Sequence, residues 1–535
     1  MRKKLSLFLA VIFVFTSVLY YTAFAKLGVV KADSLRRAII VLPGIMGSNL
    51  EETDGTVVWV TNKWIDGSKQ LYYFLNGTLD CTSDGFSEKA IEPVTGGEEY
   101  GAEDTYKKLV TSLKAEFGNS YDIVFGAYDW RLDNTYSAKQ LKKIIDKYDK
   151  VSIVAHSMGG LVVSKYISLY GGNKLDKVIT LGTPYWGALN AASTLHTGQV
   201  DEFPAGIKQL MSGTMRSTLL NYPGLNELLP DENYTEKSNW LVTSERKYDN
   251  WYDYIWPDYY DKLNDAEDTE AFMENDFNSK LVEQADSFHK SIEDTITPIK
   301  TVNYTAIVGT GIDTLKTVKL VDTSIAGIET RLSIPEEYSS GDGTVPLLSS
   351  TMGEDINYIE RPGVSHADLV NDDATISLVV ENLKGIKANN ALKSQSSAFT
   401  KTNADMNKLV FVGDLDFDAI KDNKVKYHIH SEKDIESGKD FNITNIGNVN
   451  GQNVFFISYK NDGYSLKLTS KKAQNITFAY GTSSKRFAFK NIKLGNKASV
   501  YIMNKFSNKN DVFIDYNDSG MKNSISTSDI KEISK

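Results

Sequence analysis

Apolar and polar residues alternate between two periods over residues 38–181. Short continuous apolar runs, typical of strands buried on both faces of a sheet, are separated by segments whose apolar residues recur at helical spacing. The predicted strands are residues 38–42, 121–127, 151–155 and 177–181, and the predicted helices are residues 106–117, 141–148 and 159–170. Strands that alternate with helices predict a parallel sheet with helices on both faces.

The alternation stops near residue 190. Residues 190–300 follow no clear period and are rich in acidic and aromatic residues, with eight aromatic residues between Trp240 and Tyr260. Two further strands and a last helix are predicted at residues 304–308, 357–359 and 374–383. We therefore predict an α/β domain over residues 33–388 that carries residues 190–300 as an inserted cap or lid.

The last part of the chain has a different pattern. Residues 389–407 have the polar composition of a linker, and residues 408–535 hold short strand candidates with polar turns and poor helical periodicity. These candidates are residues 409–411, 454–458, 464–468, 487–489 and 512–514. The pattern predicts a separate all-β accessory domain. Its candidate partners are a cell surface, a glycan or a membrane.

Composition follows the same division. All seven Trp and all eleven Pro lie before residue 363. From residue 401 on, 21 Lys and Arg against 15 Asp and Glu give a net charge of +6. Since the whole chain carries −10, residues 1–400 carry −16. An acidic chain is not expected to bind nucleic acid. The single cysteine, Cys81, excludes an internal disulfide and cysteine-based zinc or iron–sulfur sites.

The N-terminal segment has the layout of an export signal. Three basic residues precede the uncharged run 5–25, and small residues offer two cleavage points, after Ala25 and after Ala32. An uncleaved anchor is the alternative, because an uncharged run of this length can span a bilayer. We predict a signal peptide over residues 1–32, which implies a protein that is secreted or attached to the cell surface.

The strongest single motif is Ala-His-Ser-Met-Gly at residues 155–159. It lies between a predicted buried strand and a predicted apolar helix, and it differs by one methyl group from the Gly-x-Ser-x-Gly nucleophile elbow. The strained turn needs small residues two positions before and two after the serine, because larger side chains would collide with the strand and the helix. The turn would place the Ser157 hydroxyl at a helix N-terminus, which favours developing negative charge. A chance match is the alternative.

A nucleophilic serine needs a general base and an acid that orients it, and in α/β-hydrolases these follow in the order Ser, Asp or Glu, His. Asp342 lies in Gly-Asp-Gly, and His366 lies on a loop after a predicted strand, so both follow Ser157 in this order. The alternatives are a turn-stabilising aspartate and a surface histidine. We predict Ser157 as the nucleophile, His366 as the base and Asp342 as the orienting acid.

The oxyanion hole needs two backbone N–H groups. One is expected from Met158, the residue after the nucleophile, and the other from the loop after the first strand, where the N–H of Ile45 is our candidate. An ordinary Pro-Gly turn is the alternative for that loop. In the aromatic part of the cap, Trp251 and Trp256 are candidate substrate contacts, because amphipathic rings line acyl channels or lie at bilayer surfaces. An ordinary packed cap is the alternative for them.

Five ordered motifs resemble the lecithin:cholesterol acyltransferase family. They are Leu-Pro-Gly-Ile-Met-Gly-Ser-Asn-Leu at 42–50, Ala-Tyr-Asp-Trp-Arg at 127–131, Ala-His-Ser-Met-Gly at 155–159, Leu-Gly-Thr-Pro-Tyr-Trp-Gly at 181–187 and Gly-Asp-Gly-Thr-Val at 341–345. The elbow and the Asp-containing turn are also similar to those of lysosomal phospholipase A.

This resemblance covers residues 38–385. It implies an α/β-hydrolase fold, a triad of Ser157, Asp342 and His366, and an oxyanion hole at Ile45 and Met158. It also implies transfer of a fatty acyl group from a lipid ester to water or to another alcohol.

The chain departs from the mammalian relatives in the cap, where they pin a lid loop with a disulfide that one cysteine cannot form. Asp129 and Arg131 look like a family signature, but Asp-x-Arg after a strand is interpreted as a buried structural pair.

We predict a monomeric serine hydrolase or O-acyltransferase that acts on lipid esters, of the phospholipase A type, with hydrolysis favoured. The substrate lies in a lipid or membrane surface, and neither metal nor cofactor is expected. A triacylglycerol lipase, carboxylesterase or amidase on the same scaffold is one alternative. A surface-binding protein with a secondary hydrolase domain is another.

Overall fold

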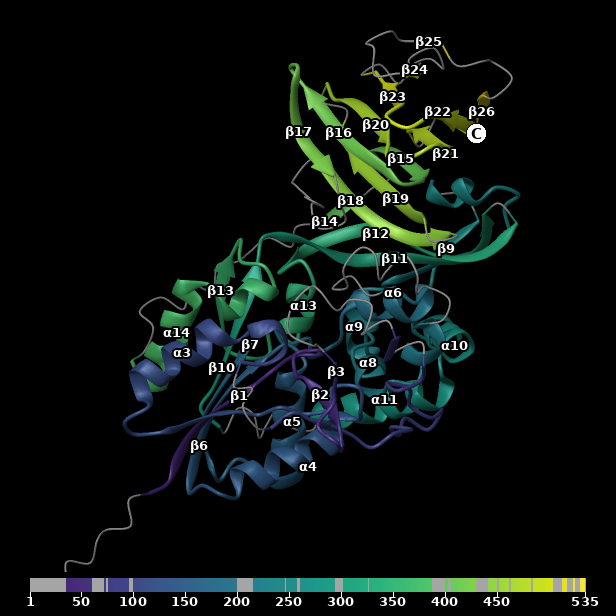
Figure 1. Cartoon of the computed structure of the whole chain (residues 1–535). Helices are drawn as coiled ribbons and strands as arrows, with labels where there is room; N and C mark the ends of the chain where they lie inside the picture. The colour runs from purple at the N-terminus through teal and green to yellow at the C-terminus, as the bar shows by residue number, and fades with distance from the viewer. Residues whose placement is uncertain are drawn as a thin grey trace, which may run out of the picture.

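The protein consists of an α/β domain and a β-rich domain that are stacked on a long β-hairpin (Figure 1). The computed structural model describes residues 35–59, 72–73, 76–95, 100–199, 215–245, 247–256, 260–293, 302–325, 327–386, 400–402, 406–429, 441–449, 452–460, 463–482, 485–503, 512–516, 523–524 and 530–534. The predicted signal peptide, residues 1–32, and most of the predicted linker, residues 389–407, lie outside these ranges.

A six-stranded parallel sheet forms the centre of the α/β domain, in the order β13-β10-β7-β6-β1-β5. Its strands are β1 (Arg37–Leu42), β5 (Asp122–Phe125), β6 (Lys150–His156), β7 (Leu175–Leu181), β10 (Tyr304–Thr310) and β13 (Tyr358–Pro362). All six were predicted from the apolar runs. The order places β6, which precedes Ser157, in the interior of the sheet.

Helices cover both faces of this sheet, because successive strand residues point to opposite sides. On β1, Ile39 and Val41 join a cluster with α3 (Lys107–Phe117) and α14 (Asp373–Lys384). Ile40 and Leu42 join the larger cluster on the other face. That face carries α4 (Asn134–Ile145), α5 (Gly159–Tyr170) and α11 (Ser279–Glu293). A sheet covered on both sides explains why its strands read as continuous apolar runs.

The predicted cap is largely helical, which corrects the expectation of an irregular segment. Its helices are α6 (Leu189–Thr197), α8 (Pro223–Asn226), α9 (Glu232–Lys237), α10 (Ala266–Asp276) and α11, with the 3₁₀ helix η2 (Trp251–Ile255). The buried residues of α11 are Leu281, Val282, Ala285, Phe288, His289 and Ile292. This spacing is a regular helical period, so the signal was present in the sequence and the surrounding acids obscured it.

A long antiparallel hairpin that the sequence analysis missed leaves the sheet after β10. Its strands β11 (Ile312–Ile325) and β12 (Ile328–Gly341) lie in a sheet ordered β14-β12-β11-β8-β9. The other strands of this sheet are β8 (Leu241–Ser244), β9 (Asp261–Leu263) and β14 (Thr400–Thr402). Because Ile312 pairs with Gly341, the hairpin returns the chain to the end of β10 and delivers Asp342 there.

The C-terminal domain consists of two six-stranded sheets, ordered β18-β19-β15-β21-β22-β26 and β17-β16-β20-β23-β24-β25, both antiparallel. The strands are β15 (Asn407–Val412), β16 (Leu415–Lys421), β17 (Lys424–Ile429), β18 (Phe441–Val449), β19 (Gln452–Tyr459), β20 (Ser465–Ser470), β21 (Gln474–Gly481), β22 (Lys485–Leu494), β23 (Ser499–Ile502), β24 (Val512–Asp515), β25 (Asn523–Ser524) and β26 (Ile530–Ser534). One apolar cluster contains residues of both sheets. The predicted all-β architecture is confirmed.

The hairpin and the C-terminal domain share a buried apolar interface. Leu332 and Ile334 of β12 lie in one cluster with Phe456 and other accessory-domain residues. At this boundary Lys408 is fully buried and donates from Nζ to the carbonyl of Ile255 at 3.0 Å. Burial lowers the pKa of Lys408 to about 8. Packing of this kind holds the two domains against each other.

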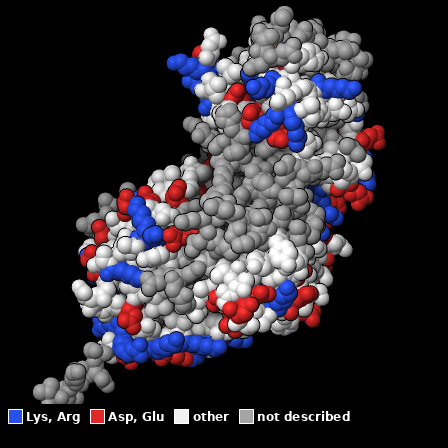
Figure 2. All heavy atoms as spheres, viewed as in Figure 1, with Lys and Arg blue, Asp and Glu red and all other residues white. Residues whose placement is uncertain are grey.

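Charged residues of both signs are scattered over the described part of the visible face, with a row of Lys and Arg along the lower edge of the α/β domain (Figure 2). The net charge of −10 is therefore not concentrated on a single acidic face in this view. Among the described residues, no helix is both long enough and apolar enough to span a bilayer.

Asp129 and Arg131 form the buried structural pair that the sequence suggested. Arg131 Nη2 and Asp129 Oδ2 are 2.6 Å apart, and the two side chains are 0% and 3% exposed. The remaining guanidinium donors bind the carbonyl of Leu79 and the hydroxyl of Ser87, each at 3.0 Å. Burial alone would lower the pKa of Arg131, but the charge and hydrogen bonds of Asp129 raise it overall. The pair joins the chain after β5 to residues 79–87.

Replacing Asp129 with asparagine is expected to lower the free energy of unfolding by about 3–5 kcal/mol, because the Arg131 charge would stay buried without its partner. Urea unfolding followed by tryptophan fluorescence measures this, since all seven tryptophans lie between residues 59 and 256. Asp176→Asn, at an exposed position of β7, is the matched control and should change little. Equal stability of the two variants would contradict the structural role.

Candidate active site

Ser157 occupies a sharp turn between β6 and α5. Its φ of +53° lies in the left-handed region that side chains with a Cβ rarely adopt. Two hydrogen bonds hold the turn: the Ser157 N–H donates to the carbonyl of Leu181 at 2.9 Å, and the Thr183 hydroxyl donates to the carbonyl of Ser157 at 3.0 Å. A strained serine between a buried strand and a helix is the geometry of a nucleophile elbow.

The small residues around Ser157 are required by close contacts. A Cβ on Gly159 would lie 2.6 Å from the carbonyl oxygen of Pro43, a backbone atom that cannot rotate away. Two residues before the serine, Ala155 is fully buried in the core. A Cβ on Gly44 would lie 2.8 Å from the Cβ of Ser157. The loop after β1 therefore lies directly against the nucleophile.

The oxyanion candidates Ile45 and Met158 lie on the two sides of this contact. Ile45 follows Gly44, and Met158 is the N-cap residue of α5, where the helix dipole favours negative charge. Within the described part of the chain, neither backbone N–H has a hydrogen-bond partner. The N–H of Gly44, in contrast, is occupied by the Tyr106 hydroxyl at 2.8 Å. Two unused N–H groups beside the serine fit an oxyanion hole.

Replacing Gly44 with alanine is expected to lower kcat/KM for a chromogenic ester by about 10²–10³-fold, the usual effect of losing one oxyanion donor. The added methyl group would meet Ser157, so the loop and the Ile45 N–H would have to withdraw. Gly495→Ala is the control, because a Cβ there meets nothing within 4 Å. Full activity of the Gly44 variant would argue against this loop as part of the oxyanion hole.

Asp342 and His366, the predicted acid and base, are in direct contact. Asp342 Oδ2 lies 2.7 Å from His366 Nδ1, and the other carboxylate oxygen accepts the N–H groups of Thr344 and Val345 at 3.0 and 2.7 Å. The carboxylate can only accept, so Nδ1 carries the proton and Nε2 is left with its lone pair. The Asp342 side chain is 1% exposed and that of His366 12%, so the acid is buried and the base is reachable.

The acid–base pair lies beside the elbow. A Cβ on Gly182, the residue after Leu181, would lie 2.9 Å from Asp342 Oδ2 and 3.0 Å from His366 Nδ1. Leu181 itself accepts the N–H of Ser157. The ends of β6, β7, β10 and β13 thus bring the three predicted triad residues to one edge of the sheet.

The structure corrects the role of Trp251 and Trp256, which the sequence suggested as substrate contacts. Both are buried, at 6% and 0% exposure, in the cluster between the hairpin and the accessory domain. The Arg486 guanidinium of β22 lies 5.5 Å from the centre of the Trp256 ring. Side chains enclosed in this way support packing, and neither is available to line an acyl channel or a bilayer surface.

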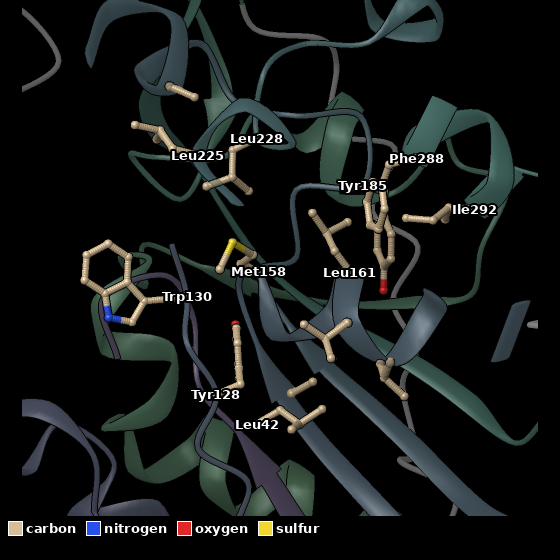
Figure 3. Packing of buried hydrophobic residues seen from close by; sticks show 14 of the residues in the cluster. Leu42, Tyr128, Trp130, Met158, Leu161, Tyr185, Leu225, Leu228, Phe288 and Ile292 are labelled. Carbon is tan, nitrogen blue, oxygen red and sulfur yellow. The ribbon is translucent and has the colours of Figure 1, made fainter. Parts of the chain in front are cut away.

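The cap contributes other residues near the nucleophile. Met158 is fully buried in the cluster that also holds Leu225 and Leu228, and Figure 3 shows its side chain pointing toward these two leucines. Tyr128 and Trp130 belong to the same cluster. The segment around α8 therefore packs against the elbow through Met158. Among the described residues, no group of three or more His, Cys, Asp or Glu could hold a metal ion.

Sequence reasoning missed three residues of the site. Gly182 and Thr183 support the elbow through the contacts described above, and Tyr106 binds the N–H of Gly44. Gly182 and Thr183 lie inside the motif at residues 181–187 that resembles the lecithin:cholesterol acyltransferase family, and this motif could have indicated them. Tyr106 was assigned only to the apolar face of a helix, and no local pattern indicated its contact with Gly44.

A family model for lecithin:cholesterol acyltransferase matches residues 78–313. Residues 78–313 are therefore similar to the lecithin:cholesterol acyltransferase family. The match confirms the resemblance that the sequence motifs suggested. It contains Ser157 and ends before Asp342 and His366. The family places the chain among lipid-acting hydrolases and acyltransferases. No curated protein sequence matches the chain.

Three of the solved structures that are similar to this chain are the following. The Tle4–Tli4 complex matches at 15% identity, with 65% of this chain and 98% of that chain covered and a TM-score of 0.47. The mature Bacillus licheniformis lipase BlEst2 matches at 13% identity, with 66% and 93% covered and a TM-score of 0.30. A putative aryl esterase from Burkholderia cenocepacia matches at 11% identity, with 66% and 92% covered and a TM-score of 0.26. At these identities the similarity concerns the fold alone.

Proposed function

We propose that this protein is a serine hydrolase that cleaves acyl esters of lipids, with phospholipid as the substrate class. The observation that carries the proposal is the strained Ser157 elbow next to the hydrogen-bonded Asp342–His366 pair. The family match supports a lipid ester over other acyl compounds. Water is the proposed acyl acceptor.

In this mechanism Ser157 Oγ attacks the acyl carbonyl carbon while His366 Nε2 takes the hydroxyl proton. The electron pair of the carbonyl bond moves to the oxygen, where the N–H groups of Ile45 and Met158 donate. The imidazolium is stabilised by Asp342 through the Nδ1–H. His366 then returns the proton to the leaving alcohol, whose C–O bond breaks to give an acyl-serine.

The second half repeats these steps with water. His366 removes a proton from the water molecule, whose oxygen attacks the acyl-serine carbonyl. The bond to Ser157 Oγ breaks, His366 reprotonates the serine, and the fatty acid leaves. An alcohol in place of water would give an acyltransferase, so this outcome depends on which nucleophile reaches the acyl-enzyme.

Substrate profiling tests the proposal. The purified full-length protein is given phosphatidylcholine vesicles, emulsified triolein and 4-nitrophenyl butyrate, with and without a long-chain alcohol. Fatty acid release that is fastest from phosphatidylcholine is the expected result. Preference for triolein or the butyrate ester would favour the triacylglycerol lipase or carboxylesterase alternative, and acylated alcohol as the main product would favour an acyltransferase.

Fluorophosphonate labelling separates enzyme from binding protein. A labelled Ser157 is expected, because the reagent requires an activated serine. An unlabelled protein that still attaches to cells or liposomes would favour a surface-binding protein.

The proposed location is outside the cell, and the accessory domain is proposed to hold the enzyme at a cell surface, glycan or membrane. Fractionation of cells that express the full chain tests the location.

A further inference from the structure

A chain of hydrogen bonds behind the nucleophile joins the two loops that flank it. The N–H of Gly44, on the loop after β1, donates to the Tyr106 hydroxyl at 2.8 Å. That hydroxyl lies 3.0 Å from His156 Nδ1. On the far side of the same ring, His156 Nε2 lies 3.1 Å from the backbone carbonyl of His366. These hydrogen bonds thus connect the loop after β1, here called the oxyanion loop, to the loop after β13, here called the base loop. They pass through His156, the residue before Ser157.

The partners determine the direction of each bond. A carbonyl oxygen only accepts, so His156 Nε2 carries the hydrogen and donates it to His366. In the neutral ring Nδ1 is then an acceptor, and it takes the Tyr106 hydroxyl proton. The phenol oxygen is left to accept from the N–H of Gly44. In this tautomer each of the three contacts pairs a donor with an acceptor.

The surroundings keep the His156 ring neutral. It is buried, and burial, followed by the nearby His366, lowers its pKa to about 3. The rings of His156 and His366 have centres 4.8 Å apart, and the titratable groups that face His156 are Tyr106, His366 and Asp342. A neutral His156 leaves the catalytic proton to His366.

We propose that Tyr106 and His156 are positioning residues that hold the oxyanion loop and the base loop at a fixed separation on either side of Ser157. Both side chains are buried, Tyr106 at the N-terminus of α3 and His156 at the end of β6. The inference rests on the proposed function of the site. It goes beyond that function by assigning a role to two residues that do not take part in the reaction.

The role follows from how the site is assembled. Its donors and its base come from loops after β1, β6 and β13. β1 and β6 are paired neighbours, but β7 and β10 lie between β6 and β13, so two strands separate the base loop from the elbow. A reacting group that moves by about 1 Å can cost about 10²-fold in rate. The Tyr106 hydroxyl occupies the N–H of Gly44, so the next N–H, that of Ile45, is the donor available to the substrate.

Kinetics with 4-nitrophenyl butyrate test the positioning role. In Tyr106→Phe and His156→Phe, kcat is expected to fall by about 10–10²-fold with little change in KM, because the loops lose their connection and the substrate pocket is kept. His156→Gln should restore most of kcat, since its amide offers one donor and one acceptor. Tyr121→Phe, a partly buried tyrosine in the cluster under α3, is the control.

Histidine ¹⁵N NMR tests the geometry without any need for catalysis. In the ¹⁵N-histidine-labelled full chain, the ring signal that His156→Gln removes should have its hydrogen on Nε2 and show no protonation of Nδ1 down to about pH 5. The other tautomer, or a charged ring at pH 6, would overturn the hydrogen-bond chain.

The outcomes separate this inference from the proposed function. A wild-type protein that neither hydrolyses the ester nor binds fluorophosphonate refutes the proposed function, and with it the positioning role. The NMR result then reports on the hydrogen-bond chain alone. In an active enzyme, unchanged kcat in both phenylalanine variants overturns the positioning role. So does a His156→Gln variant as slow as His156→Phe at equal melting temperature, or a His156→Phe variant as inactive as His366→Gln.

Discussion

Replacing Ser157 with alanine is expected to abolish esterase activity, with kcat lowered by about 10⁵-fold or more, and to leave the fold intact. The hydroxyl supplies the bond-forming oxygen, and the rest of the site can only stabilise a slow attack by water. Alanine also removes no polar contact that holds the turn, because the hydrogen bonds there use backbone atoms of Ser157. Fluorophosphonate labelling should vanish together with activity.

The comparison for this variant is Ser112→Ala, which changes a serine on the exposed face of α3 that bonds only to its own helix. Its rate and labelling should equal those of the wild-type protein, and circular dichroism should be the same for all three proteins. Residual labelling of Ser157→Ala at the wild-type level would place the nucleophile elsewhere and refute the elbow assignment.

Replacing Asp342 with asparagine is expected to lower kcat by about 10⁴-fold. One oxygen would still accept the N–H groups of Thr344 and Val345, so the turn should survive. The amide nitrogen would then face His366 Nδ1 and require that nitrogen to accept. The imidazole hydrogen would move to Nε2, the atom that must take the proton of Ser157.

Asp368→Asn is the matched control, since this acid lies two residues after His366 and its carboxylate accepts the Ser365 hydroxyl at 2.6 Å. The control should lose little activity, and both variants should keep the wild-type melting temperature within a few degrees. Equal activity of the two variants would show that Asp342 serves the turn alone, the alternative that Gly-Asp-Gly left open.

The strands of the central sheet and the elbow could be predicted because their signals are local. Strands such as β1 are buried on both faces, so they read as unbroken apolar runs. The elbow was recognised from its five-residue motif, although the contact that requires a small residue at position 159 is with Pro43 on the loop after β1. The triad was predicted from chain order, because the fold class leaves few candidates for the acid and the base.

The hairpin β11–β12 could not be predicted in the same way. Its residues contact α6 on the α/β side and the accessory domain on the other, so both faces are partly buried and the alternation of apolar and polar residues is weak. The helix α11 was missed for a different reason. Its apolar period is regular, but acidic neighbours lowered the contrast on which pattern reading depends.

The tryptophans show how far composition reaches. An aromatic segment predicted a buried or amphipathic surface, and the burial of Trp251 and Trp256 agrees with the first of these. Which surface covers them is decided by the accessory domain, more than 150 residues later in the chain. No local sequence pattern indicates which surface will cover an apolar residue, because the hydrophobic effect is non-directional.

The sequence by itself predicted the strands of the central sheet, the turn at Ser157, and Asp342 and His366 as the candidate acid and base. These depend on local periodicity, on the sterics of one turn and on chain order. The tertiary structure alone decided where the cap and the aromatic residues pack, and that Tyr106 and His156 connect the two catalytic loops. Those contacts join residues 50 and 210 positions apart, and hydrogen bonds at such separations form only after the whole sheet has brought the loops together.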